Sequence, residues 1–342
     1  MINADKTQQW KADTRASIDQ FNAWFMDCAP KTFRDSRVKT VESVKQGLLA
    51  TTDLTQITPE VIRNFPATLQ TLRMSTCPPL ARDRLAGLAG TTRTLVVTLE
   101  EGRLPRQMSE QRLKQNLEKL IAIIARLLDV DILPWIGRDH GPSEEERYRS
   151  STIIADRLCG AVADPIVRNA QEQRQLALIE DYLVSKGYAH KPHPTNKEIT
   201  EMEPGTFAFR TNVFVRNVEE PDEEDDGEEN GVVEVEKEVI VENGNELVRI
   251  PIDVVIQLKS AKLPQLPILI EAKSAGDFAN TNKRRKEEKT KMYQLKATFG
   301  DHVRFILFLC GYFGPRYLGY EAAEGIDWVW EHRITDLDQL GI

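Results

Sequence analysis

Apolar residues in the first half of the chain recur at spacings of three and four, the period of one face of an α-helix. The spacing is clearest in residues 18–28 (IDQFNAWFMDC) and 113–128 (LKQNLEKLIAIIARLL). Ser143 and Glu146 have the spacing of a capping box, which starts a helix. Gly187 follows the last periodic segment and is a natural C-cap. The pattern predicts an N-terminal half built from helices alone.

Prolines in this half predict where the helices end, because proline lacks the N–H donor that a helix interior needs. The residues concerned are Pro30, Pro66, Pro78, Pro79, Pro105, Pro134 and Pro165.

The second half changes to the two-residue alternation that is typical of strands. Residues 206–216, 231–241 and 247–258 alternate polar and apolar positions and are rich in β-branched and aromatic side chains. Residues 267–274 (PILIEAKS) and 303–313 (VRFILFLCGYF) are more continuously apolar, which indicates central strands buried on both faces.

A basic, helix-forming stretch at 282–300 separates these two apolar strands. The order strand, helix, strand implies a crossover connection and therefore some parallel pairing. Residues 327–332 (DWVWEH) predict a final strand. The predicted fold class is α+β or α/β, with a helical domain at 1–165 and a second domain at 166–342 that holds a mixed central sheet flanked by helices.

Composition fits this two-domain picture. The chain has 342 residues, of which 41% are hydrophobic and 29% charged, as in an ordinary globular protein. No apolar run is long enough to span a membrane, and the N-terminus lacks the apolar core of a signal peptide. The four cysteines lie far apart without a CxxC pair, so we interpret them as buried thiols of a cytoplasmic protein.

The net charge of −8 comes from one segment. Residues 219–229 (EEPDEEDDGEE) contain nine acids and no base, and without those nine charges the net charge rises from −8 to +1. Such a run is usually a solvated loop, although a DNA-mimicking or autoinhibitory role is an alternative. The acidic balance therefore does not exclude a nucleic-acid partner.

Three residues, from the predicted strands at 247–258 and 267–274, carry the candidate chemistry. Glu271 and Lys273 are two positions apart on one strand and so face the same side. If residues 247–258 pair with this strand, Asp253 lies beside them. Two carboxylates converging with an ammonium suit Mg²⁺ binding and phosphodiester hydrolysis. The alternative is a solvated cross-strand salt bridge, but the apolar sequence around the pair indicates burial, where charges need a partner or a metal.

These residues resemble the PD-(D/E)xK nuclease motif, with the difference that Pro251 lies two residues before Asp253 instead of directly before it. The continuation at 271–288 (EAKSAGDFANTNKRRKEE), together with 74–90 (MSTCPPLARDRLAGLAG) and 127–137 (LLDVDILPWIG), is similar to the XamI-type restriction endonucleases. The resemblance covers most of the chain. It implies an α/β nuclease core, Mg²⁺-dependent cleavage of double-stranded DNA, and a homodimer matched to a palindromic site.

The resemblance also implies roles for individual residues. Asp253 and Glu271 would bind the metal through their side chains, Ala272 would bind it through its carbonyl, and Lys273 would be the catalytic lysine. Many members add an acid from a helix beside the sheet. In residues 176–183 (LALIEDYL), Glu180 borders the apolar face and is the candidate; the alternative is an ordinary surface glutamate.

Candidate DNA contacts are assigned by charge. The basic stretch after the motif suits phosphate contact, and its alternative is a solvated helix face with salt bridges between neighbouring turns. Arginines around turns of the helical half are candidates for reading bases. The residues are Asn280, Asn282, Lys283, Arg284, Arg285 and Lys286 in the basic stretch, and Arg82 and Arg84 in the helical half, where Arg73 and Arg93 lie nearby.

We therefore predict a Mg²⁺-dependent type II restriction endonuclease, whose helical domain supplies dimerisation and DNA grip and whose gene has a methyltransferase gene as neighbour. A nuclease that recognises DNA structure in repair or at junctions is one alternative. A DNA-binding protein without chemistry is another.

Overall fold

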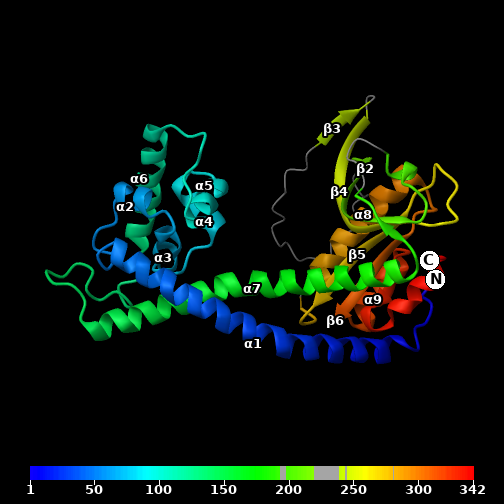
Figure 1. The fold of residues 1–342 in the computed structure, drawn as a ribbon, viewed down its shortest axis with the longest axis horizontal. Helices are drawn as coiled ribbons and strands as arrows, with labels where there is room; N and C mark the ends of the chain where they lie inside the picture. The colour runs from blue at the N-terminus through cyan, green and yellow to red at the C-terminus, as the bar shows by residue number, and fades with distance from the viewer. Residues whose placement is uncertain (193–197, 219–238, 243–244, 280) are drawn as a thin grey trace, which may run out of the picture. The chain divides into compact units, whose positions relative to one another are not determined.

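The computed structural model describes residues 1–192, 198–218, 239–242, 245–279 and 281–342 (Figure 1). The acidic run at 219–229 lies outside these residues, as does most of the segment at 231–241 that was predicted to form a strand.

The described chain forms two compact units. Unit 1 combines residues 1–26 with residues 169–342, and unit 2 consists of residues 27–168. The predicted division after residue 165 cuts the chain once, whereas the compact units divide it at two points. The difference arises because the first helix starts against the sheet: Trp10 packs on Trp328, with ring centroids 5.5 Å apart.

Unit 2 is helical, as the sequence pattern predicts. Its core is made by apolar faces that each show helical spacing, such as Leu113, Leu117, Leu120 and Ile124. The Ser143–Glu146 capping box is confirmed, since each residue's side chain accepts a backbone N–H of the other. The helices are α1 (Trp10–Ala50), α2 (Pro59–Asn64), α3 (Thr68–Met74), α4 (Arg82–Ala89), α5 (Arg93–Glu100), α6 (Glu110–Leu127) and α7 (Glu144–Ser185), of which α1 and α7 contribute residues to both units.

Two of the proline predictions are wrong. Pro30 lies inside α1 and Pro165 inside α7, so neither ends a helix. A proline within a helix removes one hydrogen bond but need not end it when the turns on both sides are held by packing. Both prolines lie within about one helical turn of the points where the chain passes from one unit to the other.

The described residues of unit 1 form a mixed seven-stranded sheet, which confirms the predicted α+β class. The order is β1-β2-β4-β5-β6-β7, with β3 paired to β4; β4 is antiparallel to β2 and β5, while β5, β6 and β7 are parallel. The strands are β1 (Ala189–His190), β2 (Thr206–Arg216), β3 (Val239–Glu242), β4 (Asn245–Gln257), β5 (Ile268–Ala275), β6 (Phe305–Gly311) and β7 (Asp327–Trp330). Gly187, which precedes β1, has the positive φ of a helix C-cap.

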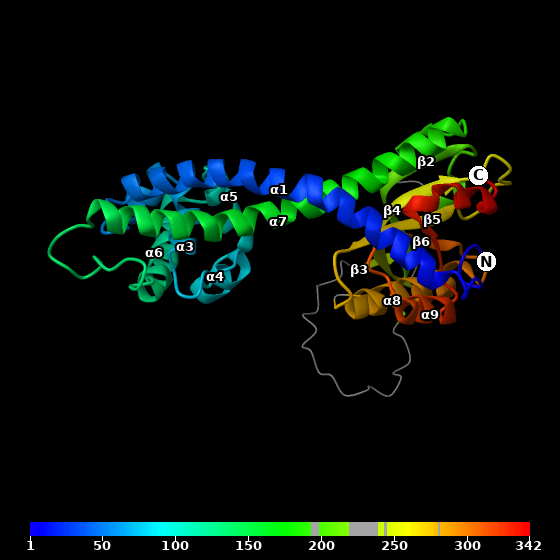
Figure 2. The ribbon, with the colours of Figure 1, turned by 90° about the horizontal axis from the view of Figure 1, so that it is seen from below.

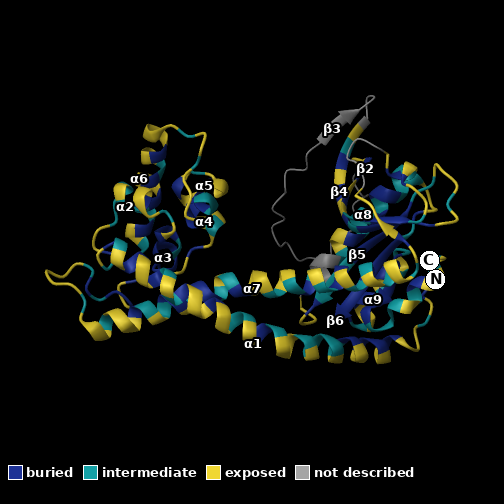
Figure 3. Cartoon of the chain, in the orientation of Figure 1, coloured by how far each residue is buried: buried dark blue, intermediate teal, exposed yellow. Residues whose placement is uncertain are grey.

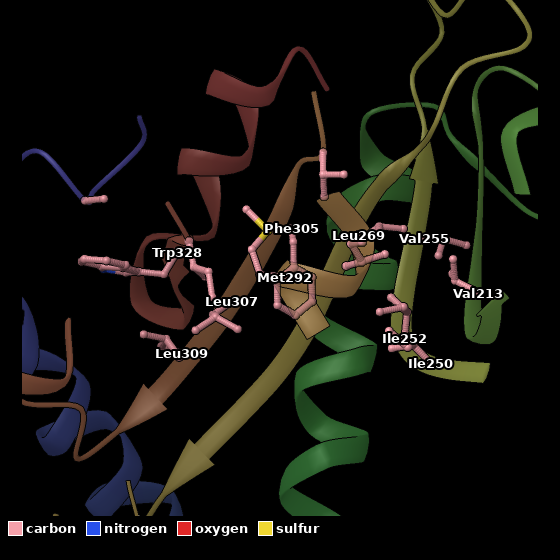
Figure 4. Close-up of a cluster of buried hydrophobic side chains, with 14 of the residues drawn as sticks. Val213, Ile250, Ile252, Val255, Leu269, Met292, Phe305, Leu307, Leu309 and Trp328 are labelled. Carbon is pink, nitrogen blue, oxygen red and sulfur yellow. The ribbon is translucent and has the colours of Figure 1, made fainter. Parts of the chain in front are cut away.

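Helices cover both faces of this sheet. On one face, α8 (Thr281–Phe299) and α9 (Pro315–Ala323) are the crossovers from β5 to β6 and from β6 to β7, and they lie side by side (Figure 2). Met292 of α8 packs with Leu269 and Phe305 in the core on that face (Figure 4). The other face is covered by the end of α7 and by the 3₁₀ segment Glu331–Leu340. The chain has a further 3₁₀ turn at Ile199–Glu201, between β1 and β2.

Burial explains why β5 and β6 are so apolar. Every residue of β6 is buried, and the first four of β5 are buried as well (Figure 3). The four cysteines are free: Cys159 and Cys310 are buried, whereas Cys77 is exposed and Cys28 half-buried, so the prediction of four buried thiols holds for two of them. Among the described residues, none of the helices is long and apolar enough to cross a membrane.

Candidate active site

The site begins where β4 and β5 separate. Their pairing runs from Ile256–Ile268 to Val254–Ile270, and Asp253 stands at the next position, opposite Glu271. The Asp253 Oδ2 atom accepts a hydrogen bond of 2.8 Å from the backbone N–H of Ala272. The aspartate side chain therefore accepts a hydrogen bond from a backbone N–H of β5 that lies just beyond the last paired residues of β4 and β5.

Glu271 and Lys273 lie on the same face of β5, as the alternation of a strand requires. The Lys273 Nζ atom is 3.2 Å from Glu271 Oε1, and Lys291 Nζ of α8 is 2.7 Å from the same oxygen. The other oxygen, Glu271 Oε2, is buried and accepts no hydrogen bond from the described part of the chain. One glutamate oxygen thus has two ammonium partners, and the other has none.

A second carboxylate approaches Lys273 from α8. Glu288 Oε1 lies 3.5 Å from Lys273 Nζ, and Glu288 Oε2 accepts a hydrogen bond of 2.8 Å from the hydroxyl of Tyr317 in α9. Glu321, one turn after Tyr317, is buried beside this pair. Burial raises the pKa of Glu321 to about 9, and the charge of Glu288 adds to the rise.

The electrostatics follow from this crowding of charges. Burial raises the pKa of Asp253, and the neighbouring charge of Glu271 raises it further. Burial alone would lower the pKa of Lys273, but the carboxylates of Glu271 and Glu288 outweigh it, so the pKa is raised and the side chain is an ammonium. The carboxylates of Asp253 and Glu271 repel each other, and a cation bound between them would reduce this repulsion.

The residues present fit a hard divalent cation. Asp253 and Glu271 offer carboxylate oxygens and Ala272 a carbonyl oxygen, which is the donor set that Mg²⁺ prefers. The unpartnered, buried Glu271 Oε2 is the observation that favours a bound cation. No group of three or more His, Cys, Asp or Glu side chains suited to a metal occurs within the described residues. Water would therefore complete the coordination, as is usual for Mg²⁺.

Glu180 lies apart from this network. Its carboxylate is 42% exposed and is 3.6 Å from His190 Nδ1, next to the edge strand β1. Gln175 of α7 does contact β5 near the site, since its side chain donates to the carbonyl oxygens of Lys273 and Phe308 at 3.4 and 3.3 Å. The role assigned to Glu180 remains a prediction, and its ion pair within the described residues is with His190.

The predicted DNA contacts divide into exposed cations, cations held by another side chain, and residues outside the described part of the chain. Lys286 is exposed on α8, whereas the Arg285 guanidinium lies 3.9 Å from the centre of the Tyr320 ring. Arg84 is exposed, but Arg82 pairs with Glu100 at 2.5 Å. Outside the described residues fall Asn280 and the side chains of Asn282, Lys283 and Arg284. The two further arginines, Arg73 and Arg93, pair with Glu100 and Asp83.

Sequence reasoning missed that α8 contributes to the site itself. Lys291 and Glu288 were taken as members of a DNA-contacting helix, and Tyr317 was not considered. A signal was available: Glu288 stands four residues before buried Met292 and seven before buried Leu295, so it shares their face. The run of charges around it concealed this periodicity.

Two comparisons with known proteins found matches to the sequence of this chain. The family model described as XamI restriction endonuclease matches residues 52–330. The chain belongs to the XamI restriction endonuclease family. It is 49% identical, over the full length of both chains, to the type II restriction enzyme SalI of Streptomyces albus G. No solved structure matches the chain.

Family membership confirms the predicted activity. The protein is a type II restriction endonuclease, an endodeoxyribonuclease that cleaves DNA at specific sites. Restriction enzymes act on double-stranded DNA, and those of type II generally use a divalent metal. The repair nuclease and the non-catalytic DNA-binding protein are thereby disfavoured.

Proposed function

We propose that this restriction endonuclease cleaves a short palindromic sequence in double-stranded DNA in a Mg²⁺-dependent reaction, acting as a homodimer. Asp253 and Glu271 hold the metal with the carbonyl of Ala272, and Lys273 is the catalytic lysine. The observation that carries the proposal is the juxtaposition of Asp253 with the Glu271–Lys273 pair at the point where β4 leaves β5.

Bound there, Mg²⁺ would polarise the scissile phosphate and lower the pKa of a coordinated water. Side chains and backbone groups of the protein position the ligands for this metal. Glu271 Oε2 is the oxygen free to accept a new partner, since Oε1 is shared by Lys273 and Lys291. The hydrogen bond from Ala272 N fixes the Asp253 carboxylate, so that its other oxygen is the one available to a ligand.

Lys273 acts as an ammonium. Its raised pKa favours donation of hydrogen bonds over removal of a proton, so it orients the attacking water and stabilises the charge that develops on the phosphate. Gln175 holds the strand at this point through the Lys273 carbonyl. The side chain is thereby aimed from a rigid element, as catalysis requires.

The palindrome and the homodimer are linked proposals. A two-fold symmetric protein presents the same site to both strands of a palindrome, so two copies cut both strands. In this proposal the helical domain supplies dimerisation and DNA grip, and a methyltransferase encoded by a neighbouring gene protects the host's own sites.

The test is digestion of unmethylated plasmid with Mg²⁺, followed by sequencing of the product ends. Discrete bands with one common end sequence are expected; nicking at branched structures would favour a structure-specific nuclease. Asp253→Ala should abolish cleavage, and Lys273→Ala should lower the single-turnover rate by orders of magnitude to a small but measurable residual rate, while DNA binding in Ca²⁺ survives in both. The matched control is Asp301→Ala, at an exposed turn of the same unit. Wild-type cleavage by Lys273→Ala would refute the assigned site.

A further inference from the structure

Behind the catalytic lysine lies a carboxylate that the proposed reaction does not use. Glu288 is completely buried although it stands in one of the most charged stretches of the chain. The two residues before it on α8, Lys286 and Glu287, are exposed. Burying a carboxylate is costly unless it is paired and hydrogen-bonded, so the position of Glu288 calls for a reason.

Both Glu288 oxygens are directed at specific groups. Oε1 faces the Lys273 ammonium at 3.5 Å, and Oε2 accepts the Tyr317 hydroxyl at 2.8 Å. The hydroxyl comes from α9, so the carboxylate is held from one helix while it faces a strand. Its orientation is thus set independently of Lys273.

Glu321 makes the arrangement asymmetric. It is as deeply buried as Glu288, and neither of its carboxylate oxygens accepts a hydrogen bond within the described residues. Two adjacent buried carboxylates cannot both ionise at low cost. Burial raises the pKa of Glu321 to about 9, which favours its protonated form at neutral pH. Burial also raises the pKa of Glu288, but the Lys273 ammonium and the Tyr317 hydroxyl oppose that rise and so favour the charged form of Glu288.

The ammonium geometry gives this contact a consequence. The Lys273 ammonium lies close to two carboxylate oxygens: it donates a hydrogen bond to Glu271 Oε1 at 3.2 Å and forms an ion pair with Glu288 Oε1 at 3.5 Å. One of its three N–H donors is thus directed at Glu271, and the charge of Glu288 restricts the directions left to the other two. A lysine on a flexible stem would otherwise rotate freely about its terminal bonds.

We infer that Glu288, held by Tyr317, is a positioning residue that restricts the directions in which Lys273 donates its remaining hydrogen bonds. The inference rests on the proposed function, in which Lys273 serves the attacking water. Glu288 acts through Lys273 and not on the metal, because its own two oxygens are already engaged by Lys273 and Tyr317.

The test compares Glu288→Gln with the matched control Glu287→Gln, the same substitution one residue away on the exposed face. Single-turnover cleavage by Glu288→Gln should fall by about 10- to 100-fold, the usual effect of losing a group that orients an active-site residue. KM, the Mg²⁺ concentration for half-maximal rate, and DNA binding in Ca²⁺ should stay unchanged. Glu287→Gln should cleave like the wild type.

A double-mutant cycle separates positioning from a general structural effect. In the Lys273→Ala background, Glu288→Gln should cause no further loss, because the group it serves is gone. Tyr317→Phe should reduce the rate in the same direction by a smaller factor. It keeps the ring in the core, and it replaces Glu288→Gln as the readout if that variant does not fold.

Two results would overturn the inference: wild-type rates in both Glu288→Gln and Tyr317→Phe, or an equal loss from Glu288→Gln with and without Lys273. A shift in the Mg²⁺ requirement of Glu288→Gln would also overturn it, since that would make Glu288 a metal ligand. Failure of the proposed function looks different, because Lys273→Ala itself would then cleave normally.

Discussion

Each unit of the protein buries one glutamate against two cationic side chains, and the two arrangements differ in one respect. In unit 2, Glu100 pairs through Oε1 with Arg73 at 2.7 Å and through Oε2 with Arg82 at 2.5 Å. In unit 1, Glu271 gives Oε1 to both Lys273 and Lys291 and leaves Oε2 without a partner in the described chain. Both carboxylate oxygens of Glu100 therefore have a cationic partner, whereas one oxygen of Glu271 has no partner within the described residues.

The contrast separates a structural ion pair from a candidate catalytic one. Two arginines, each permanently charged, take one oxygen of Glu100 apiece, so the carboxylate is fully paired, which suits a permanent contact. Lysines crowd on one oxygen and leave the rest of the carboxylate open to a ligand. An unsatisfied buried oxygen costs stability, so its presence beside perturbed titratable groups indicates function.

The largest expected effect is on catalysis in unit 1. Glu271→Gln should lower the cleavage rate by on the order of 10³-fold, since metal stabilisation of the transition state contributes several kcal/mol. Lys273 retains Glu288 as an anionic partner, so unfolding monitored by circular dichroism should show a smaller loss of stability than the same substitution produces at Glu100. A cleaving Glu271→Gln enzyme would remove Glu271 from the metal site.

The matched substitution in unit 2 should do the opposite. Glu100→Gln leaves the buried Arg73 guanidinium without its counter-charge, and breaking such a pair costs about 3–5 kcal/mol. Denaturant unfolding should report this loss. Cleavage per folded molecule should be unchanged at low temperature, because no catalytic group is altered; a specific loss of rate without destabilisation would contradict the comparison.

The pH dependence of stability should be concentrated in unit 1. The pKa of Glu321 in the folded chain, about 9, lies above its ordinary 4.5, so the folded state binds this proton more tightly than the unfolded state. Its contribution is fully present below about pH 4.5 and is lost as pH rises through 9, with a slope of at most about 1.4 kcal/mol per pH unit. The raised pKa values of Asp253 and Glu288 act in the same direction. Unfolding of Glu321→Gln between pH 5 and 9 should therefore show a flatter profile than the wild type; equal profiles would rule out the buried proton.

The smallest effects should come from exposed cations. Lys286→Ala on α8 and Arg84→Ala in unit 2 each remove one candidate phosphate contact, which should weaken binding similarly for all sequences and lower the salt slope by about 1. Filter binding in Ca²⁺ at several salt concentrations measures this. If only one variant changes the slope, the other residue lies off the DNA path.

The sequence predicted the strands better than the division of the chain. Residues 206–216 form β2 over the predicted range, and β5, α8 and β6 follow as the crossover required, with the expected parallel pairing. Local alternation and loop connectivity are enough for that. The placement of residues 1–26 with the sheet depends on contacts more than 300 residues apart in sequence, such as Asn3 N to Asp327 Oδ1. No local sequence pattern predicts such a long-range contact.

Within the site, the sequence by itself determined that Glu271 and Lys273 share a face, because strand periodicity fixes it. It placed Asp253 beside them only on the condition that residues 247–258 pair with their strand, and the pairing of β4 with β5 meets that condition. Only the tertiary structure decided that Glu288 and Lys291 join them and that Glu180 turns toward His190. The physical reason is that a helix's direction of approach depends on how its apolar face packs across the sheet, which the charges along its own sequence do not encode.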